Sequence, residues 1–419
     1  MIETVPQPEN NVTAAFPVQD ARAKFPALAK SAPFVYFDNA AGAQLPQSVL
    51  DTVARHLLEI NVQRGGRYAK SRAVDAMIAD SREKVAAWIN ADDPSEVCFG
   101  MNATSFIRMV SLAIGQTVVA PRNRVVVTDL DHDANVATWR ALDRMGVEIV
   151  WWRMRDGGTL HVEDLVPLLD ERVRLVACTS VSHALGSLVD IPGVARAAHA
   201  VGAEMFVDSV HYGPHALVDV QAWDCDYLVC SGYKAFSPHM GFLWGKRDKL
   251  IALPTFREEF IPDEPPYKVE AGTFVFENVA GMGAAVDYFE ALGRQLGTSG
   301  DRRAALVAAM NAIQLYEQSL SRAMLDELKT VGATVHGLDD EIKRVPTIAF
   351  NIDGREPKRV VEAMSDEGFG IRDGHMYAPR LMERLGLSMD RGCMRVSLVH
   401  YNTLEEVARF GAALRRVVR

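Results

Sequence analysis

The sequence predicts an α/β fold with a mostly parallel sheet in a large domain and a second, smaller α/β domain. Apolar, strand-like runs at residues 175–179, 204–207 and 227–230 alternate with helical segments such as residues 191–201. Strands that alternate with helices indicate parallel connections. The 419 residues are enough for one large core and a smaller one.

The composition excludes several classes of protein. It is 48% hydrophobic and 24% charged, which is ordinary for a globular chain, and the net charge of -9 gives no reason to expect nucleic acid or an anionic membrane as a partner. The longest apolar runs are strand-sized and far shorter than a bilayer span. Because the segment from Met1 to Pro6 lacks the basic and then apolar pattern of a signal peptide, we expect a cytoplasmic protein.

The cysteines predict reduced, buried thiols and no metal site. Their number is odd, and none of their spacings matches a CxxC redox or zinc pattern. The five residues are Cys98, Cys178, Cys225, Cys230 and Cys393.

The first half of the chain follows the alternating pattern. A polar, Pro-containing arm and an amphipathic segment at residues 18–28 precede a sharp turn at residues 36–43, and Pro46 suits the first turn of a helix. Further strands are expected at residues 124–128 and 147–153.

The second half contains the elements expected to form the smaller domain. Residues 241–245 read as a strand that returns beside the preceding one, and the Pro- and acid-rich loop 254–266 is long enough for a lid or an interface. A helix over about 301–331 is expected to bridge the two domains, before strands 347–352 and 394–398 and helix 357–367. The predicted division is an arm and helix of the small domain (1–33), a large domain (34–295) and a small domain (296–419).

Lys234 and Asp208 form the central chemical prediction. Lys234 follows the apolar strand 227–230, and a lysine that loses hydration favours its neutral amine, the form that attacks an aldehyde. Asp208 ends the strand before it, where an acid can hold a proton on a pyridine nitrogen. This pair suits pyridoxal 5'-phosphate (PLP). A solvated lysine and a turn-capping aspartate are the structural alternative.

Three other segments have the chemistry of a ligand site. The small-residue turn before the helix at residues 106–110 includes Ala103 and Thr104 and suits a phosphate or a simple capping turn. His132 follows strand 124–128 and can stack on a ligand ring or cap a helix. Arg67 belongs to the basic loop 64–71, which suits an anion or solvent.

Seven segments, in order, resemble the class V aminotransferase family, particularly its cysteine desulfurase-like branch. They are FDNAAG (37–42), DHDAN (131–135), VSHALG (181–186), DSVH (208–211), SGYK (231–234), EAGT (270–273) and RVSLVHYNT (395–403). The resemblance runs from about residue 34 to the C-terminus. It implies a PLP-dependent transferase fold of the aspartate aminotransferase type with a seven-stranded-type sheet, and a homodimer with active sites at the interface.

The resemblance also implies a role for each matching residue. Lys234 would form the imine with PLP and move the Cα proton through an external aldimine and a Cα carbanion, and Arg395 would bind the substrate carboxylate, unless it forms a structural salt bridge. Expected cofactor contacts are Lys234, Asp208, His132, Ala103, Thr104, His183, His211, Ser231, Tyr233 and, across the dimer, Thr273. Expected substrate contacts are Arg395, Asn39, Ala40, Arg67, Arg372 and His375.

The chain departs from the family at four positions. Desulfurases usually have Asn at His183, Gln at His211 and His at Tyr233. Tyr377 stands in the loop 372–382 where the persulfide-forming cysteine is expected, and Cys393 lies on a predicted strand. Tyr377 is a candidate proton donor, or a ring that packs in a lid.

Because a phenol cannot carry a persulfide, the reaction predicted first is a C-S (Cβ-X) lyase reaction on an amino acid, without persulfide transfer. The alternatives are a class V aminotransferase, an amino-acid racemase or epimerase, and a PLP-binding protein without turnover.

Overall fold

The computed structural model describes residues 16–118 and 120–419. The expected arm lies largely outside the described residues, as does the segment Met1 to Pro6. The amphipathic segment expected at residues 18–28 forms two short helices, α1 (Val18–Ala23) and α2 (Pro26–Ser31), rather than one. Pro26 occupies the first turn of α2, where its missing N–H costs no helical hydrogen bond.

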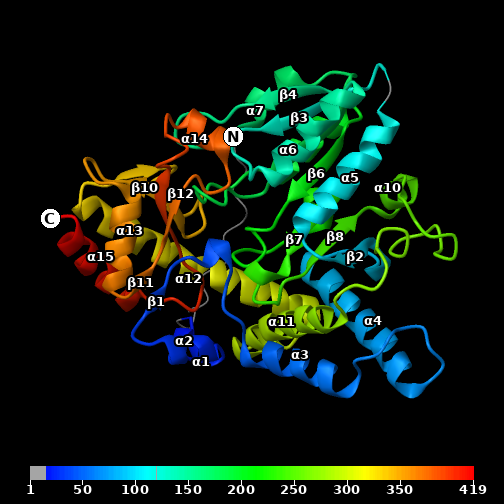
Figure 1. The fold of residues 1–419 in the computed structure, drawn as a ribbon, viewed down its shortest axis with the longest axis horizontal. Coiled ribbons are helices and arrows are strands. Elements are labelled where there is room, and N and C mark those ends of the chain that lie inside the picture. Colours follow the sequence, from blue (N-terminus) through cyan, green and yellow to red (C-terminus); the bar gives the residue numbers. More distant parts are fainter. Residues whose placement is uncertain (1–15, 119) are drawn as a thin grey trace.

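A seven-stranded sheet forms the centre of the described structure, in the order β2-β8-β7-β6-β5-β3-β4 (Figure 1). Strand β8 runs antiparallel to both its neighbours, and the remaining pairs are parallel. This arrangement confirms the predicted fold class and the strand that returns beside the lysine. The strands are β2 (Val97–Gly100), β3 (Arg124–Thr128), β4 (Glu148–Trp152), β5 (Val173–Thr179), β6 (Glu204–Asp208), β7 (Tyr227–Ser231) and β8 (Gly241–Gly245).

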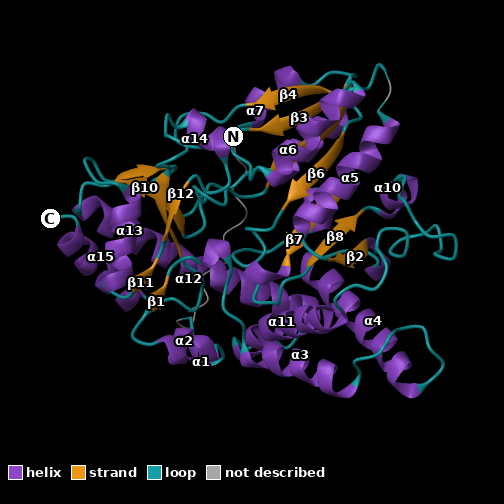
Figure 2. Cartoon of the chain, viewed as in Figure 1, coloured by secondary structure: helices purple, strands orange, loops and turns teal. Residues whose placement is uncertain are grey.

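Helices cover both faces of this sheet, as a parallel sheet requires (Figure 2). On β5, Val176 packs into a cluster with α4, α8 and α11, whereas its neighbours Leu175 and Ala177 pack against α5 and α6 on the other face. The helices of this part are α3 (Gln47–Glu59), α4 (Ala69–Ile89), α5 (Ala103–Thr117), α6 (Ala134–Arg140), α7 (Val162–Leu165), α8 (Ile191–Ala200), α9 (Val220–Trp223), α10 (Arg247–Ala252) and α11 (Phe276–Gln295).

The C-terminal part contains a four-stranded antiparallel sheet in the order β12-β13-β10-β9. Its elements are α12 (Arg302–Thr330), β9 (Thr334–His336), β10 (Thr347–Asn351), α13 (Pro357–Asp366), β11 (Phe369–Gly370), β12 (Arg372–Gly374), α14 (Pro379–Arg384), β13 (Cys393–Ser397) and α15 (Leu404–Val417). Strand β1 (Val35–Tyr36) pairs with β11, so residues 35–36 join this part of the chain. The domain boundaries at 33/34 and 295/296 stay predictions.

Helix α12 links the two cores. Leu306 and Met310, near its start, pack with the central sheet, whereas Leu320 and Met324, further along, pack with the C-terminal elements. A single helix with both contacts confirms the bridging helix that the sequence predicts at residues 301–331.

Candidate active site

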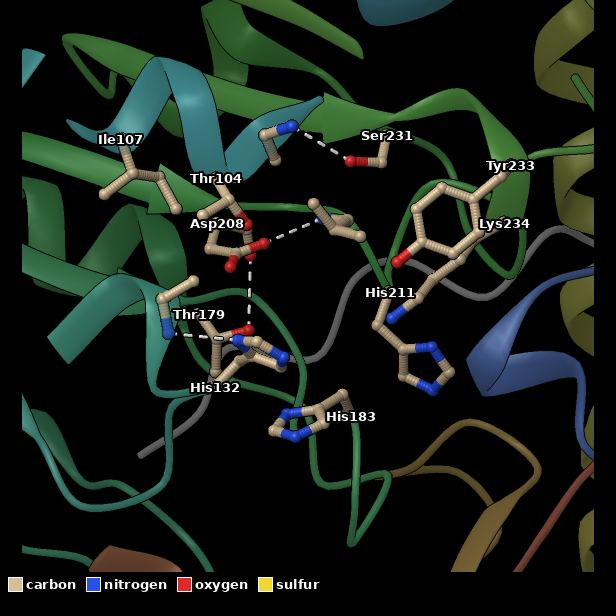
Figure 3. Close-up of a pocket in the computed structure, with 13 residues that line it drawn as sticks. Thr104, Ile107, His132, Thr179, His183, Asp208, His211, Ser231, Tyr233 and Lys234 are labelled. Atoms are coloured by element: carbon tan, nitrogen blue, oxygen red, sulfur yellow. Dashed lines mark hydrogen bonds between the residues drawn. The ribbon is translucent and has the colours of Figure 1, made fainter. Parts of the chain in front are cut away.

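A cavity lies at the carboxyl ends of the parallel strands, where open α/β sheets bind their ligands (Figure 3). The cavity and its open mouth together contain about 440 Å³ of space not filled by atoms. Its lining combines residues from α5, the β3–α6 turn and the ends of β5, β6 and β7. They are Ala103, Thr104, Ile107, His132, Ala134, Thr179, His183, Asp208, Val210, His211, Ser231, Tyr233 and Lys234.

Lys234 ends a single 3₁₀ turn, Gly232–Lys234, that directly follows β7. The turn is fixed because the Gly232 N–H donates to the carbonyl of Met240, at 2.8 Å. The side chain is only 6% exposed, and burial, together with the positive charge of Arg395, lowers the pKa of Lys234 to about 8. The cavity therefore contains an amine that is substantially neutral near pH 8.

Asp208 lies across the cavity from this lysine, at the end of β6 (Figure 3). Its Oδ1 atom accepts the backbone N–H of Val210 at 3.0 Å, and the side chain is 7% exposed. Burial raises the pKa of Asp208, while Lys234 opposes that shift. A buried carboxylate of this kind is suited to pairing with a protonated ring nitrogen.

The N-terminus of α5 forms another wall of the cavity. The Ala103 N–H donates to the Ser231 Oγ at 3.0 Å, and Asn102 caps the helix by accepting the Ser105 N–H at 2.9 Å. A Cβ atom on Gly241 would lie 2.6 Å from the Asn102 Cα and 2.9 Å from the Ala103 N. Glycine on β8 therefore lets the positive end of this 15-residue helix approach the cavity, an arrangement that favours a phosphate.

His132 is neutral and fixed in one tautomer. Its Nδ1 accepts the Ala134 N–H at 3.0 Å, so the ring proton is on Nε2. Burial, with the positive charges of Lys234 and Arg395, lowers the pKa of His132 to about 4. Its ring meets that of His183 edge to face, with the centroids 5.0 Å apart.

His183 and His211, the two unusual histidines, make different contacts. The His183 Nε2 lies 2.6 Å from the carbonyl oxygen of Met376, which can only accept a hydrogen bond. Among the described residues, the buried Nδ1 of His211 has no partner, and its Nε2 is 2.9 Å from the Thr347 Oγ1. Burial holds the pKa of both rings well below the ordinary histidine value, so both are neutral at pH 7.

Arg395 is buried beside the cavity and is already paired with Asp38. Its Nη2 lies 3.1 Å from the Asp38 Oδ1, and its Nη1 donates to the carbonyl of His183 at 3.0 Å. Arg372 pairs with the other oxygen of Asp38 at 2.7 Å. The sequence predicted both arginines as site residues but gave no role to Asp38, which stands in the 37–42 segment. This pairing was missed because the partners of Asp38 are 334 and 357 residues away in the chain.

Asn39 and Ala40 support the turn beside these arginines. The Asn39 Nδ2 donates to the carbonyl of Ser397 at 2.8 Å, and the Ala40 N–H donates to the Ser397 Oγ at 2.8 Å. Both residues are buried and neither lines the cavity.

Besides Asn39, Ala40, Arg372 and Arg395, four more predicted site residues lie outside the cavity lining. Arg67 and Thr273 are exposed, and Thr273 accepts a hydrogen bond from Gln63. Tyr377 is 54% exposed, with its ring centroid 5.8 Å from that of His132. His375 is partly buried, and its Nδ1 accepts the Tyr377 N–H at 3.0 Å.

The remaining chemical expectations concern metals, thiols and membranes. Within residues 16–118 and 120–419, no group of three or more His, Cys, Asp or Glu side chains could hold a metal ion. All five cysteines are free and buried. Of the described helices, none has the length and apolar character needed to span a bilayer.

Comparisons with known proteins agree on one family. The family model for aminotransferase class-V matches residues 35–410. A cysteine desulfurase of Pectobacterium carotovorum is 36% identical over 97% of this chain and 99% of its own length, and one of Dickeya dadantii is 34% identical over 96% and 97%. The solved structure of an Escherichia coli cysteine desulfurase is similar with a TM-score of 0.83 and 26% identity, covering 96% of this chain and 99% of the other.

Proposed function

Because the chain belongs to the class V aminotransferase family and is a PLP-dependent enzyme, we propose that it acts on an amino acid as a desulfurase-like C-S (Cβ-X) lyase that forms no enzyme persulfide. The observation that carries this proposal is the absence of an accessible thiol. All five cysteines are buried, and the loop that would supply a persulfide-forming cysteine presents the exposed Tyr377.

Cys393 makes a poor substitute for a loop thiol. It lies on β13 with no exposed surface, and its Sγ is 3.9 Å from the carbonyl of Gly374. Burial raises the pKa of Cys393 to about 12, which leaves almost no thiolate at neutral pH. The proposed reaction is therefore one in which the Cβ–S or Cβ–Se bond of the substrate breaks without attack by a protein sulfur, with sulfide or selenide as the leaving group, or sulfite when the substrate is a sulfinate.

The cavity fits PLP in its charge and its donors. Bound PLP supplies an aldehyde that links to amines and a protonated ring that withdraws electrons from the substrate's Cα. Ala103, Thr104 and Ser231 would hold the phosphate at the α5 N-terminus, and Asp208 would keep the ring nitrogen protonated. His132, His183, His211 and Tyr233 would contact the ring and its oxygen substituent.

Lys234 would move the proton at the substrate's Cα. A pKa of about 8 lets the amine accept a proton at neutral to mildly alkaline pH and return it, which is what a general base and acid requires. Tyr377, at the rim beside His132, is the candidate donor to the departing group. Because the His132 and His183 rings are neutral, they would not stabilise the negative charge that develops on the substrate. That charge would be stabilised by the cofactor and by Lys234.

The substrate carboxylate would bind at Arg395. One N–H of each Nη atom of Arg395 is used by protein acceptors, and the buried Nε lacks a partner among the described residues. A guanidinium has five N–H groups, so donors remain for a carboxylate. Asn39, Ala40, Arg372 and His375 would shape this side of the site. A homodimer is proposed because the exposed Arg67 and Thr273 do not line their own cavity and would serve a partner's site.

The test is to incubate PLP-loaded protein with L- and D-amino acids, including cysteine, cysteine sulfinate and selenocysteine. A keto acid with released sulfide or selenide, or alanine with released sulfite or elemental selenium, identified by mass spectrometry, supports the lyase. Accumulation of pyridoxamine phosphate with an intact side chain overturns it in favour of transamination. Deuterium entering Cα without net product indicates a racemase or epimerase, and binding of PLP without any of these changes indicates a protein without turnover.

A further inference from the structure

The turn formed by residues 375–378 has an unusual backbone. Met376 and Tyr377 both have positive φ angles, 51° and 57°. Residues other than glycine seldom adopt this conformation, and two such residues in succession are rarer still. Met376 is buried at 2% exposure, whereas Tyr377 points outward. Such a turn persists only when surrounding groups hold it in place.

The holding groups come from the rim of the cavity. The His183 Nε2–H donates to the carbonyl of Met376 at 2.6 Å, and the Asp133 N–H donates to the carbonyl of Tyr377 at 2.9 Å. Asp133 directly follows His132, so the two consecutive carbonyls of the turn are bound by the segments that carry His132 and His183. Within the turn, the Tyr377 N–H donates to the His375 Nδ1 at 3.0 Å.

Of the two hydrogen bonds to the carbonyls of Met376 and Tyr377, the one from His183 is made by a side chain. The ring is 5% exposed, lines the cavity and meets the His132 ring edge to face. Its backbone carbonyl also accepts a hydrogen bond from Arg395. His183 thus touches the cavity, the carboxylate-binding arginine and the Tyr377 turn at once.

We propose that His183 is a positioning residue: through its Nε2–H it holds the 375–378 turn closed, and so keeps Tyr377 at the rim beside His132. The proton that His183 carries is used for this contact rather than for the cofactor. The hydrogen bond explains why an imidazole is used here, because an asparagine amide nitrogen is three bonds from Cα, whereas Nε2 is four. The consequence for Tyr377 in turnover rests on the proposed function, but the contact itself does not.

Three substitutions separate the hydrogen bond from packing. His183→Gln keeps an N–H four bonds from Cα, His183→Phe keeps a ring without a donor, and His183→Asn keeps a donor that is too short. Hydrogen exchange of the peptide covering residues 374–379, followed by mass spectrometry in PLP-loaded protein without substrate, reports the turn directly. His199→Asn is the matched control, because His199 bonds Asp226 at the amino end of β7, whereas the cavity lies at the carboxyl ends of the strands.

We expect exchange at the turn to be about tenfold faster or more in His183→Phe and His183→Asn, and close to wild type in His183→Gln and His199→Asn. Wild-type exchange in both His183→Phe and His183→Asn would overturn the proposal. Equal acceleration in His183→Gln and His183→Phe would also overturn it, since packing would then be the cause. Should His183→Asn fail to fold, the Gln and Phe pair still decides the matter. Failure of the lyase assay would leave these exchange rates unaffected, so the two proposals are tested separately.

Discussion

The Asp38 carboxylate is paired with the buried Arg395, whose Nη2 lies 3.1 Å from Oδ1, while Arg372 pairs with the same carboxylate at 2.7 Å. Asp38 is 8% exposed and Arg395 is 2% exposed. An internal carboxylate therefore already occupies the guanidinium that we propose for the substrate carboxylate. The two carboxylates must share Arg395, because moving Asp38 away would leave a buried charge unpaired.

Substitution of Asp38 should separate stability from substrate binding. Asp38→Asn removes the negative charge between two arginines, so we expect unfolding free energy to fall by about 3 kcal/mol, as when one partner of a buried pair is lost. The freed arginine donors should bind the substrate carboxylate more tightly and lower KM. Denaturant unfolding and steady-state kinetics measure the two effects. Asp373→Asn on β12 is the control, and equal effects of the two changes would contradict the prediction.

The pKa of Lys234 sets the pH at which the protein takes up PLP. Only the neutral amine attacks an aldehyde, and the neutral fraction increases as pH rises through the pKa of about 8. The rate of PLP incorporation into apoprotein should therefore rise with pH and level off above about pH 8. The absorbance of the lysine-bound cofactor measures it. A rate that keeps rising to pH 10 would mean that the lysine is not perturbed, and Lys234→Ala should show no covalent incorporation.

Gly241 and Ser231 should act on cofactor affinity to different degrees. Gly241→Ala brings a Cβ atom within 2.6 Å of the Asn102 backbone, which must move away with the N-terminus of α5. Ser231→Ala removes the acceptor of the Ala103 N–H and a hydroxyl proposed to contact the phosphate, a combined loss of about 1–2 kcal/mol. We expect the Kd for PLP to rise about tenfold for Ser231→Ala and more for Gly241→Ala. Equilibrium titration of apoprotein checks this order, and a weaker effect of Gly241→Ala would contradict it.

Local sequence patterns were sufficient to predict the sheet and the central site residues. Lys234 and Asp208 each end an apolar strand, and parallel strands bring their carboxyl ends to one edge, so both side chains line one cavity. The two-stranded pairing of β1 with β11 was not predicted, because strands of two residues have no measurable periodicity. The break between α1 and α2 was missed because the apolar spacing continues across it.

Contacts between distant segments could not be predicted in the same way. His183 lines the cavity as expected, but the partner of its Nε2 is a backbone carbonyl 193 residues away, and a carbonyl has no signature in the sequence. Asp38 was likewise missed because a salt bridge depends on how two sheets pack together. The residue type sets what a side chain can donate or accept, whereas the packing of the chain determines which partner it meets.

The buried pair of His215 and Glu317 should be a major contributor to stability near the cavity. The His215 Nδ1 lies 2.7 Å from the Glu317 Oε2, both side chains are at most 3% exposed, and burial raises the pKa of Glu317. The His215 ring also lies 4.9 Å from that of His211, at the cavity wall. Glu317 on α12 therefore holds His215 in place, and His215 packs behind His211, a proposed cofactor contact.

Removing the Glu317 side chain should lower the unfolding free energy more than replacing its carboxylate with a neutral amide. Glu317→Ala leaves His215 without its acceptor and opens a cavity, so we expect a loss of about 3–5 kcal/mol in unfolding free energy. Glu317→Gln keeps an oxygen that can accept the Nδ1–H and should cost only about 1 kcal/mol. Denaturant unfolding of these variants, of His215→Ala and of the double mutant gives the interaction energy. Because the two residues touch, the double mutant should lose less than the sum of the single losses, and strict additivity would show that the contact contributes nothing.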